Sequence, residues 1–79
     1  MGGMKKLDIF LKRLRGLRAE AGATQTAVAS AVGLSLNGYQ KIERGESSPY
    51  FIVVLELAKY YNVSLDYLAG RTDIRSVFH

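Results

Sequence analysis

Apolar residues recur along this chain every three or four positions, in short segments separated by glycine and small polar residues. This spacing is typical of one face of an α-helix. It predicts helices over about Leu7 to Ala21 and Pro49 to Tyr61, two short helices within residues 25–44, and a last helix that carries Leu65 and Leu68. We therefore predict an all-α domain of five helices without strands.

The boundaries of these helices are marked by residues that satisfy unpaired backbone groups. Glycine follows four of the segments, where a left-handed residue often ends a helix: Gly22, Gly33, Gly45 and Gly70. Hydroxyl side chains precede four segments at positions suited to an N-cap: Thr24, Ser35, Ser48 and Ser64. Pro49 then takes the first helical position after Ser48.

One apolar stripe from each helix is expected to face a single shared core. The first helix contributes Phe10, Leu14 and Leu17. The inward residues of the fourth helix are predicted to be Phe51, Val54, Leu55 and Ala58. The middle of the chain adds Leu34, Tyr39 and Ile42.

Residues 25–45 have the pattern of two short helices joined by a tight turn, which is a helix-turn-helix. Gly33 supplies the turn, and Ala29 is small because the two crossing helices approach closely there. The residues on the other faces of the second helix could contact base edges, which suggests DNA binding: Leu36, Asn37, Gln40, Lys41 and Arg44.

Four sequence blocks extend this pattern over residues 10–73, namely FLKRLRGLRAEAGATQ, AVASAVGLS, YQKIERGESSP and LELAKYYNVSLDYLAGRTD. In this order and spacing they resemble the Cro/C1-type helix-turn-helix family, also known as the xenobiotic-response-element family. The resemblance implies the compact five-helix, lambda-repressor-like fold of phage repressors and many bacterial regulators. It also implies a sequence-specific regulator of transcription, most simply a repressor, that binds double-stranded DNA.

The resemblance assigns roles to individual residues. Leu36, Asn37 and Lys41 occupy the base-facing positions, with Gln40 as a further candidate that would contact either a base or the backbone. Phosphate contacts are implied for Gln25, Ser35, Arg44 and Ser47, although Gln25 and Ser35 are also good residues for starting a helix. Arg18 and Glu43 are expected to form a salt bridge that orients the scaffold.

Three departures from the family pattern change the expected surface and core. Gly38 lies inside the reading helix, where glycine costs about 0.5–1 kcal/mol relative to alanine. Tyr39 replaces a smaller apolar residue, and its hydroxyl is expected to reach the surface. Ile52 and Val53 stand where relatives carry polar residues, so with Tyr50 we expect an apolar patch on the fourth helix, or else a helix that is more deeply buried here.

Self-association is expected from this patch and from the end of the chain. The predicted dimer surface comprises Ile52, Val53, Tyr60, Ile74, Val77 and Phe78, the last three lying on one face of a helical tail. A domain of this size contacts few base pairs, so we expect a homodimer on paired half-sites roughly 34–36 Å apart. The alternative is a protein-interaction module, such as an antitoxin, that uses the same fold.

Charge and composition support this interpretation only weakly. The chain has 79 residues and a net charge of +4, with a cluster of basic residues in the first helix. That cluster could attract phosphate or could simply be a solvated helix face. The chain has no cysteine, and its one histidine is His79, so nothing suggests a disulfide, a metal site, a cofactor or an enzyme.

The chain divides most simply into three parts. Residues 1–6 form an N-terminal extension in which Met1 to Met4 resemble a cloning remnant, residues 7–70 form the domain, and residues 71–79 form a tail that ends the protein or begins a linker. No membrane span or secretory segment is evident, so a cytoplasmic location is expected. No small-molecule ligand is predicted.

Overall fold

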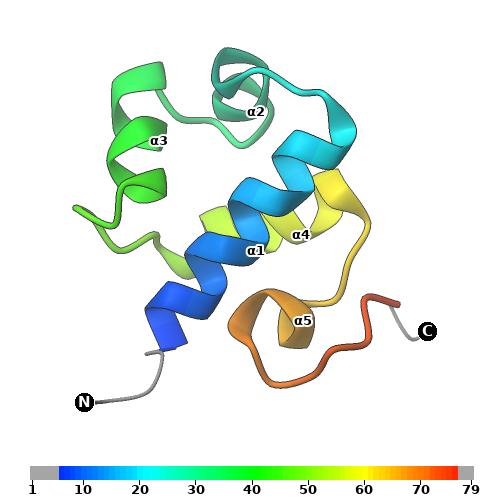
Figure 1. Ribbon diagram of the computed structural model, residues 1–79. Helices are drawn as coiled ribbons and strands as arrows, with labels where there is room; N and C mark the ends of the chain where they lie inside the picture. The colour runs from blue at the N-terminus through cyan, green and yellow to red at the C-terminus, as the bar shows by residue number, and fades with distance from the viewer. Residues whose placement is uncertain (1–5, 77–79) are drawn as a thin grey trace.

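The computed structural model describes residues 6–76, which form five α-helices around one core (Figure 1). The helices are α1 (Lys6–Ala21), α2 (Gln25–Ala31), α3 (Leu36–Glu43), α4 (Phe51–Tyr61) and α5 (Leu65–Ala69). No strand occurs among the described residues. The all-α, five-helix fold predicted from the sequence is confirmed.

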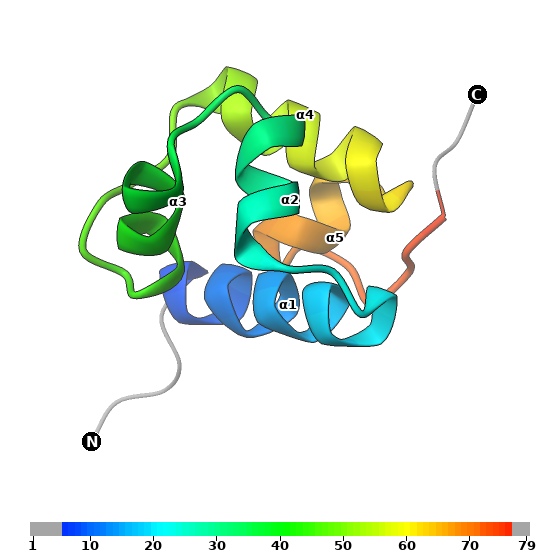
Figure 2. The same cartoon turned by 90° about the horizontal axis from the view of Figure 1, so that it is seen from above.

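The long helix α1 runs along one side of the molecule and organises the others. It packs against α5 and α3, while α2 packs against α3 and α4, and α4 against α5. Figure 2 shows α2, α4 and α5 gathered above α1, with α3 set to one side. This arrangement leaves the side of α3 that faces away from α2 open to solvent.

The core is made by apolar side chains from all five helices. Leu14, Val28, Leu57 and Leu68 are fully inaccessible to solvent and come from α1, α2, α4 and α5. The other buried apolar residues are Phe10, Leu11, Leu17, Ala29, Val32, Tyr39, Ile42, Val53, Ala58, Val63 and Tyr67. The predicted inward residues of the first helix, Phe10, Leu14 and Leu17, are confirmed.

The predicted glycine and N-cap positions hold for most boundaries. Gly22, Gly33, Gly45 and Gly70 all have positive φ values between 64° and 82°. The hydroxyls of Thr24, Ser35 and Ser64 accept backbone N–H bonds at the starts of α2, α3 and α5.

The start of α4 and part of its buried face were predicted wrongly, although Ala58 is buried as expected and Val54 is partly buried against the core. The helix begins at Phe51 after Tyr50, which makes no side-chain cap bond, so neither Ser48 nor Pro49 starts it. Phe51 is 70% exposed, whereas Val53 and Leu57 are buried. The run Phe51 to Leu55 is apolar throughout, so two different stripes satisfy helical spacing, and contact with α2 and α5 selects the one through Val53.

The tail also differs from expectation. Residues 71–76 are not helical, because Gly70 ends α5 in the left-handed conformation and the chain turns back. The backbone N–H of Ser64 then donates to the carbonyl of Arg75 at 2.9 Å. Val77 and Phe78 lie outside the described residues, as does the extension at 1–5.

Candidate nucleic-acid interface

The α2–turn–α3 unit is fixed by backbone bonds at both ends of its turn. Gly33 has a φ of 78°, and the N–H of Leu34 donates to the carbonyl of Ala29 at 2.9 Å. Ser35 then caps α3 by accepting the N–H of Gly38 at 3.1 Å. Ala29 is buried at the crossing, as expected for a small residue. The turn and its cap therefore set the direction in which α3 leaves α2.

Helix α3 is divided into a buried and an exposed face. Tyr39 and Ile42 point into the core, while Leu36, Asn37 and Lys41 are exposed to solvent. Leu36 keeps 40% of its surface accessible, which is unusual for a leucine with a nearby core to join. The three residues that the sequence predicts to contact bases thus share the open face of one helix.

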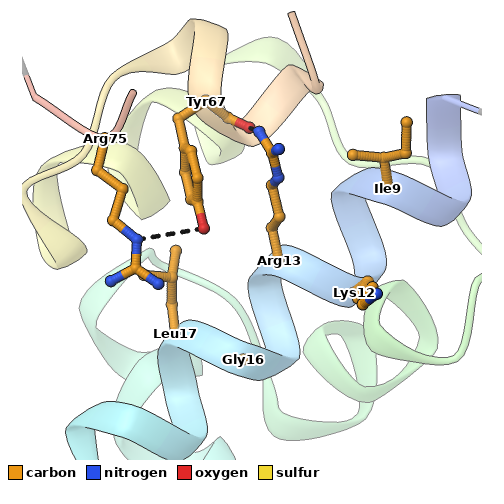
Figure 3. A pocket seen from close by; sticks show the side chains of 7 residues that line it. All are labelled: Ile9, Lys12, Arg13, Gly16, Leu17, Tyr67 and Arg75. Carbon is orange, nitrogen blue, oxygen red and sulfur yellow. Dashed lines mark hydrogen bonds between the residues drawn. The ribbon is translucent and has the colours of Figure 1, made fainter. Parts of the chain in front are cut away.

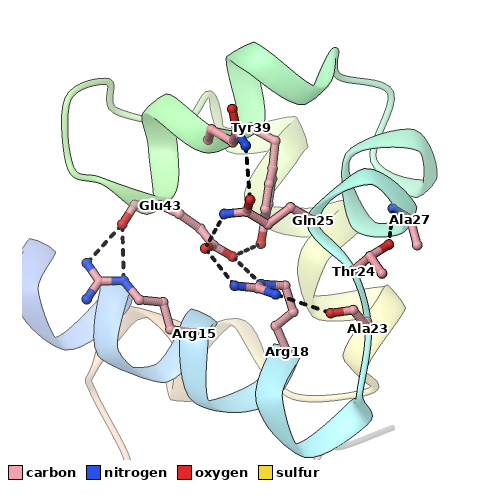
Figure 4. Close-up of polar contacts among 9 residues, drawn as sticks. Arg15, Arg18, Ala23, Thr24, Gln25, Ala27, Tyr39 and Glu43 are labelled. Carbon is pink, nitrogen blue, oxygen red and sulfur yellow. Dashed lines mark hydrogen bonds and ion pairs between the residues drawn. The ribbon is translucent and has the colours of Figure 1, made fainter.

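A polar cluster beneath α3 attaches this helix to α1 and α2. Its centre is Glu43, the only buried charged residue in the described part of the chain. Arg18 Nε donates to Glu43 Oε2 at 2.7 Å, and Tyr39 Oη donates to the same oxygen at 2.6 Å. The other oxygen, Oε1, accepts from Gln25 Nε2 at 3.0 Å (Figure 4).

These bonds determine the charge state of Glu43. Burial by itself would raise the pKa of the Glu43 carboxyl, but the hydrogen bonds from Arg18, Tyr39 and Gln25 outweigh it and hold the pKa below its ordinary value. The ionised carboxylate is thus satisfied by donors from three helices, and the sequence-predicted pair of Arg18 and Glu43 is part of a larger network.

Tyr39 does not reach the surface as expected from the sequence. Its side chain is completely buried, and its hydroxyl is used within the cluster. Burial and the bond to Glu43 raise the pKa of Tyr39 well above its ordinary value, so the phenol stays neutral and acts as a donor. The aromatic residue fits the core because the carboxylate of Glu43, one turn later on α3, accepts a hydrogen bond from its hydroxyl.

Gln25 and Gln40 bind each other. The amide nitrogen of Gln40 donates to Gln25 Oε1 at 3.0 Å, and Gln25 in turn donates to Glu43. Arg15 adds a contact from α1, because its guanidinium donates to the backbone carbonyl of Glu43 at 2.9 Å. The C-terminal half of α3 is therefore connected to α1 through Arg15 and to the start of α2 through Gln25.

The loop after α3 is short and polar. Gly45 has a φ of 76°, and the N–H of Glu46 closes the end of the helix by donating to the carbonyl of Lys41 at 2.9 Å. Arg44 and Ser47 are exposed beside it. Arg44 Nε forms an ion pair with Glu46 Oε2 at 2.7 Å, which lowers the pKa of the Glu46 carboxyl.

Most of the basic cluster in α1 is used within the protein. Arg13 donates to the carbonyl of Thr72 at 2.6 Å and to Asp73 Oδ1 at 2.7 Å, and its guanidinium lies 4.2 Å from the centre of the Tyr67 ring. Arg75 lies on the other side of that ring (Figure 3). It also forms a bidentate pair with Glu20. Nothing in the residue pattern indicated that these arginines hold the tail.

A cavity lies between α1 and α5 beside Tyr67, remote from the exposed face of α3. It is lined by Ile9, Lys12, Arg13, Gly16, Leu17, Tyr67 and Arg75. Arg13 and Arg75 already contact carbonyls or carboxylates, and Lys12 is the third cation of the lining. Within residues 6–76 there is also no group of three acidic, histidine or cysteine side chains that could hold a metal ion, and no helix long and apolar enough to cross a membrane.

The predicted dimer surface is not continuous. Val53 is buried, so it cannot contribute to a surface patch, whereas Ile52 is 59% exposed at the start of α4. Tyr60 lies near the other end of that helix, and Ile74 lies in the tail beside α5. The exposed apolar residues Tyr50 and Phe51 instead join Ile52.

Comparisons in sequence place this chain among known proteins. The profile of a helix-turn-helix family matches residues 14–68, which begin in α1 and end in α5. The HTH-type transcriptional regulator ImmR of Bacillus subtilis is 36% identical over 63 residues, which are 80% of this chain and 50% of ImmR. The cryptic phage CTXphi transcriptional repressor RstR of Vibrio cholerae is 35% identical over 60 residues, 76% of this chain and 54% of RstR.

This chain therefore spans about half the length of these two relatives. A third, the uncharacterized HTH-type transcriptional regulator YazB of Bacillus subtilis, is 36% identical over 62 residues, which cover 78% of this chain and 90% of YazB. Among solved structures, the P22 c2 repressor in complex with a synthetic operator matches with a TM-score of 0.74 and 30% identity. That match covers 81% of this chain and 97% of the repressor chain.

Proposed function

Because this chain belongs to the Cro/C1-type helix-turn-helix family, we propose that it is a sequence-specific regulator of transcription that binds double-stranded DNA and represses. The observation that carries this proposal is the exposed face of α3, which presents Leu36, Asn37 and Lys41 from a helix fixed by the Glu43 cluster. A helix that is held in place and exposes polar side chains suits the major groove, which is wide enough for one α-helix. An enzymatic role is not proposed for this family.

Each exposed residue of α3 has a matching chemistry on base edges. The Asn37 amide can bond adenine at two positions, Lys41 can donate to guanine, and Leu36 can contact a thymine methyl group. Gln40 is next along the helix but donates to Gln25, so it would contact DNA only with its remaining groups. We assign it a weaker contribution to sequence selection than Asn37 or Lys41.

Phosphate contacts are assigned to residues around the two ends of α3. Ser35, Arg44 and Ser47 are exposed there and would fix the register of α3 along the groove. Gln25 donates one amide hydrogen to Glu43, and the second remains for a phosphate. Arg44 would exchange its bond to Glu46 for a phosphate oxygen on binding.

A homodimer is proposed as the DNA-bound form. One α3 reaches only a few base pairs, whereas two copies on half-sites one helical turn apart double the length of sequence that is read. Repression is favoured because the sequence, with seven acidic against eleven basic residues, suggests no acidic surface suited to activation. RstR, which is described as a transcriptional repressor, and the operator-bound P22 c2 repressor are consistent with this outcome.

Selection of bound sequences from random duplex DNA at two salt concentrations tests the proposal. Wild type, Asn37→Ala and Lys41→Ala are compared, with Arg71→Ala after the end of α5 as a control that removes an exposed cation elsewhere. A palindromic motif that the two α3 variants lose and the control keeps is the expected result. Salt-sensitive binding without any motif would mean that the protein only attracts phosphate groups and does not recognise a sequence.

A protein-interaction module is the second candidate. It is favoured by one observation, the three exposed apolar side chains Tyr50, Phe51 and Ile52. Absence of DNA binding in the selection would favour this function over regulation of a promoter.

A further inference from the structure

An asparagine followed by a glycine lies in the first turn of α3, the helix at one side of the molecule in Figure 2. In an Asn–Gly pair the backbone nitrogen of the glycine can attack the asparagine side chain, because glycine has no Cβ that obstructs the approach. Asn37 and Gly38 form this pair. The other asparagine of the chain, Asn62, is followed by Val63, whose branched side chain does obstruct it. The two asparagines should therefore differ in chemical stability.

The fold does not require a glycine at position 38. Gly38 has a helical backbone and is not one of the glycines with positive φ. A Cβ built there would contact only the hydroxyl oxygen of Ser35, at 3.2 Å, and a small movement of that side chain makes room for it. Glycine also destabilises a helix relative to alanine. Gly38 therefore makes the first turn of α3 easier to open without improving the packing.

The attacking nitrogen is held by one exposed hydrogen bond. N–H groups in the first turn of a helix have no carbonyl partner within it, and that of Gly38 donates to the exposed Ser35 hydroxyl at 3.1 Å. Asn37 is exposed, so water reaches its carboxamide. In contrast, the N–H of Val63 donates to the carbonyl of Ala58 at 3.0 Å, and Val63 is buried. Opening a single exposed turn frees the nitrogen in α3, whereas a core residue must move after α4.

We propose, on the premise of the proposed function, that Asn37 is a site of spontaneous deamidation that removes a base-reading amide from α3. The Gly38 nitrogen loses its proton and bonds to Cγ of Asn37. The bond from Cγ to the amide nitrogen breaks, and ammonia leaves with the proton, which gives a cyclic succinimide. Water opens this ring at either carbonyl and leaves aspartate or isoaspartate. The reaction consumes only water and needs no oxidant, reductant or enzyme.

Both products change what α3 presents to DNA. The Asn37 amide can donate to and accept from one adenine, whereas a carboxylate only accepts and therefore loses one of the two bonds. Its charge is also repelled by the phosphates. Isoaspartate lengthens the main chain and interrupts the helix. A base that binds the amide holds it away from the Gly38 nitrogen, so copies on their operator are protected and unbound copies lose activity with age.

Mass spectrometry of the purified chain, aged at physiological temperature and pH, tests the reaction. Trypsin cleaves after lysine and arginine and so places the two asparagines in separate peptides, residues 19–41 and 60–71. Asn37 should deamidate several times faster than Asn62, and the duplex recovered by selection should slow only Asn37. Gly38→Ala should also slow Asn37 and leave Asn62 unchanged. Equal survival of both asparagines in the wild type would overturn the proposal.

Asn37→Asp tests the consequence for DNA binding. A carboxylate in the first turn of a helix is favourable, so the variant should fold, which circular dichroism checks. Its affinity for the selected duplex should fall about tenfold or more. The deamidated fraction of aged wild type, isolated by ion exchange, should show the same loss. Asn62→Asp is the matched control, because it adds the same charge at the end of α4, and its affinity should stay within about twofold.

The outcomes separate this proposal from the proposed function. Full affinity of Asn37→Asp and of the deamidated fraction would overturn the loss of activity while DNA binding stands. An equal loss in Asn62→Asp would show that added charge, and not the lost amide, weakens binding, which also contradicts the proposal. If fresh wild type selects no duplex, the proposed function fails, whereas the two tryptic peptides still show whether Asn37 deamidates.

Discussion

Glu43 shows how one buried charge connects three helices. Its carboxylate accepts bonds from Arg18, Tyr39 and Gln25, and its backbone carbonyl accepts from Arg15. A buried carboxylate is costly unless such donors surround it, and removing a partner from a buried pair is more costly still. The stability of this small domain should therefore depend strongly on this side chain.

We expect Glu43→Gln to lower the free energy of unfolding by about 2–3 kcal/mol. The amide keeps the shape but loses the charge and turns one acceptor into a donor that faces Arg18 or Tyr39. Urea denaturation measures the change. Glu46→Gln is the matched control, since Glu46 pairs with Arg44 on the surface and its loss should change the stability far less than Glu43→Gln. Equal effects would contradict a special role for the buried carboxylate.

The pKa of Glu43 adds a pH dependence to this contribution. Because the folded protein holds this pKa below the ordinary value of 4.5, the contribution is present at neutral pH and is lost as the pH falls through the folded pKa. Wild-type stability should decrease below about pH 4.5, and Glu43→Gln should decrease less steeply. Thermal unfolding between pH 3 and 7 tests the difference, and parallel curves would exclude Glu43 as the titrating group.

Removal of the two buried tyrosine hydroxyls should change the free energy of unfolding differently. Tyr39→Phe leaves the Glu43 carboxylate with one donor fewer and should cost about 1–2 kcal/mol. The hydroxyl of Tyr61 is buried without a hydrogen-bond partner among residues 6–76, and burial raises the pKa of Tyr61 to about 12. Tyr61→Phe should therefore be neutral or stabilise the protein by up to about 1 kcal/mol. A comparable loss of stability in both variants would show that the Tyr61 hydroxyl forms a hydrogen bond in solution.

At the scale of helices, the N-caps show where the local sequence determines the start of a helix and where it does not. Thr24→Ala and Ser35→Ala remove hydroxyls that accept bonds at 3.0 and 3.1 Å and should each cost about 1 kcal/mol. Ser48→Ala removes a residue with the same sequence signature but no cap bond, so its effect should stay within about 0.3 kcal/mol. Chemical denaturation of the three variants tests this, and an equal loss for Ser48→Ala would restore the sequence prediction.

The same helices show how far sequence reasoning extends. The segments of α1, α2, α3 and α5 carry one clear apolar stripe or cap each, so their number, order and approximate boundaries followed from spacing. In α4, five consecutive apolar residues permit two stripes, and only packing against α2 and α5 places Val53 inside and Phe51 outside. The tail was predicted from spacing alone, whereas bonds from Arg13 and Arg75 hold its described part in a non-helical path.

At the scale of the whole molecule, formal charge overstates the positive surface available to DNA. Four arginines donate to carbonyls or carboxylates of residues that are distant in the sequence. They are Arg13, Arg15, Arg18 and Arg75. The sequence predicted the exposed residues of α3 correctly, because the apolar stripe marks the buried face of a helix and the exposed face must lie opposite it. It could not distinguish a phosphate-binding arginine from a structural one, since that depends on which carbonyls the fold brings near.

The salt dependence of DNA binding should show which arginines reach phosphate. Each phosphate contact contributes a slope of about −0.9 to the logarithm of the affinity against the logarithm of salt concentration. Arg44→Gln removes only one of several positive charges. It should nevertheless reduce the steepness of the slope by about one unit. The measurement is fluorescence anisotropy on one duplex between low and physiological salt.

Arg71→Gln is the matched control, because the Arg71 side chain is also exposed, at 77% against 51% for Arg44, but lies after α5, where it pairs with Asp66 at 3.9 Å. If the protein attracts DNA through its overall field, both variants lose the same steepness, because both lose one charge from +4. If a discrete phosphate contact forms beside the end of α3, only Arg44→Gln changes the slope. The second result is expected, since a screened charge beyond about 10 Å from the duplex releases no counterion.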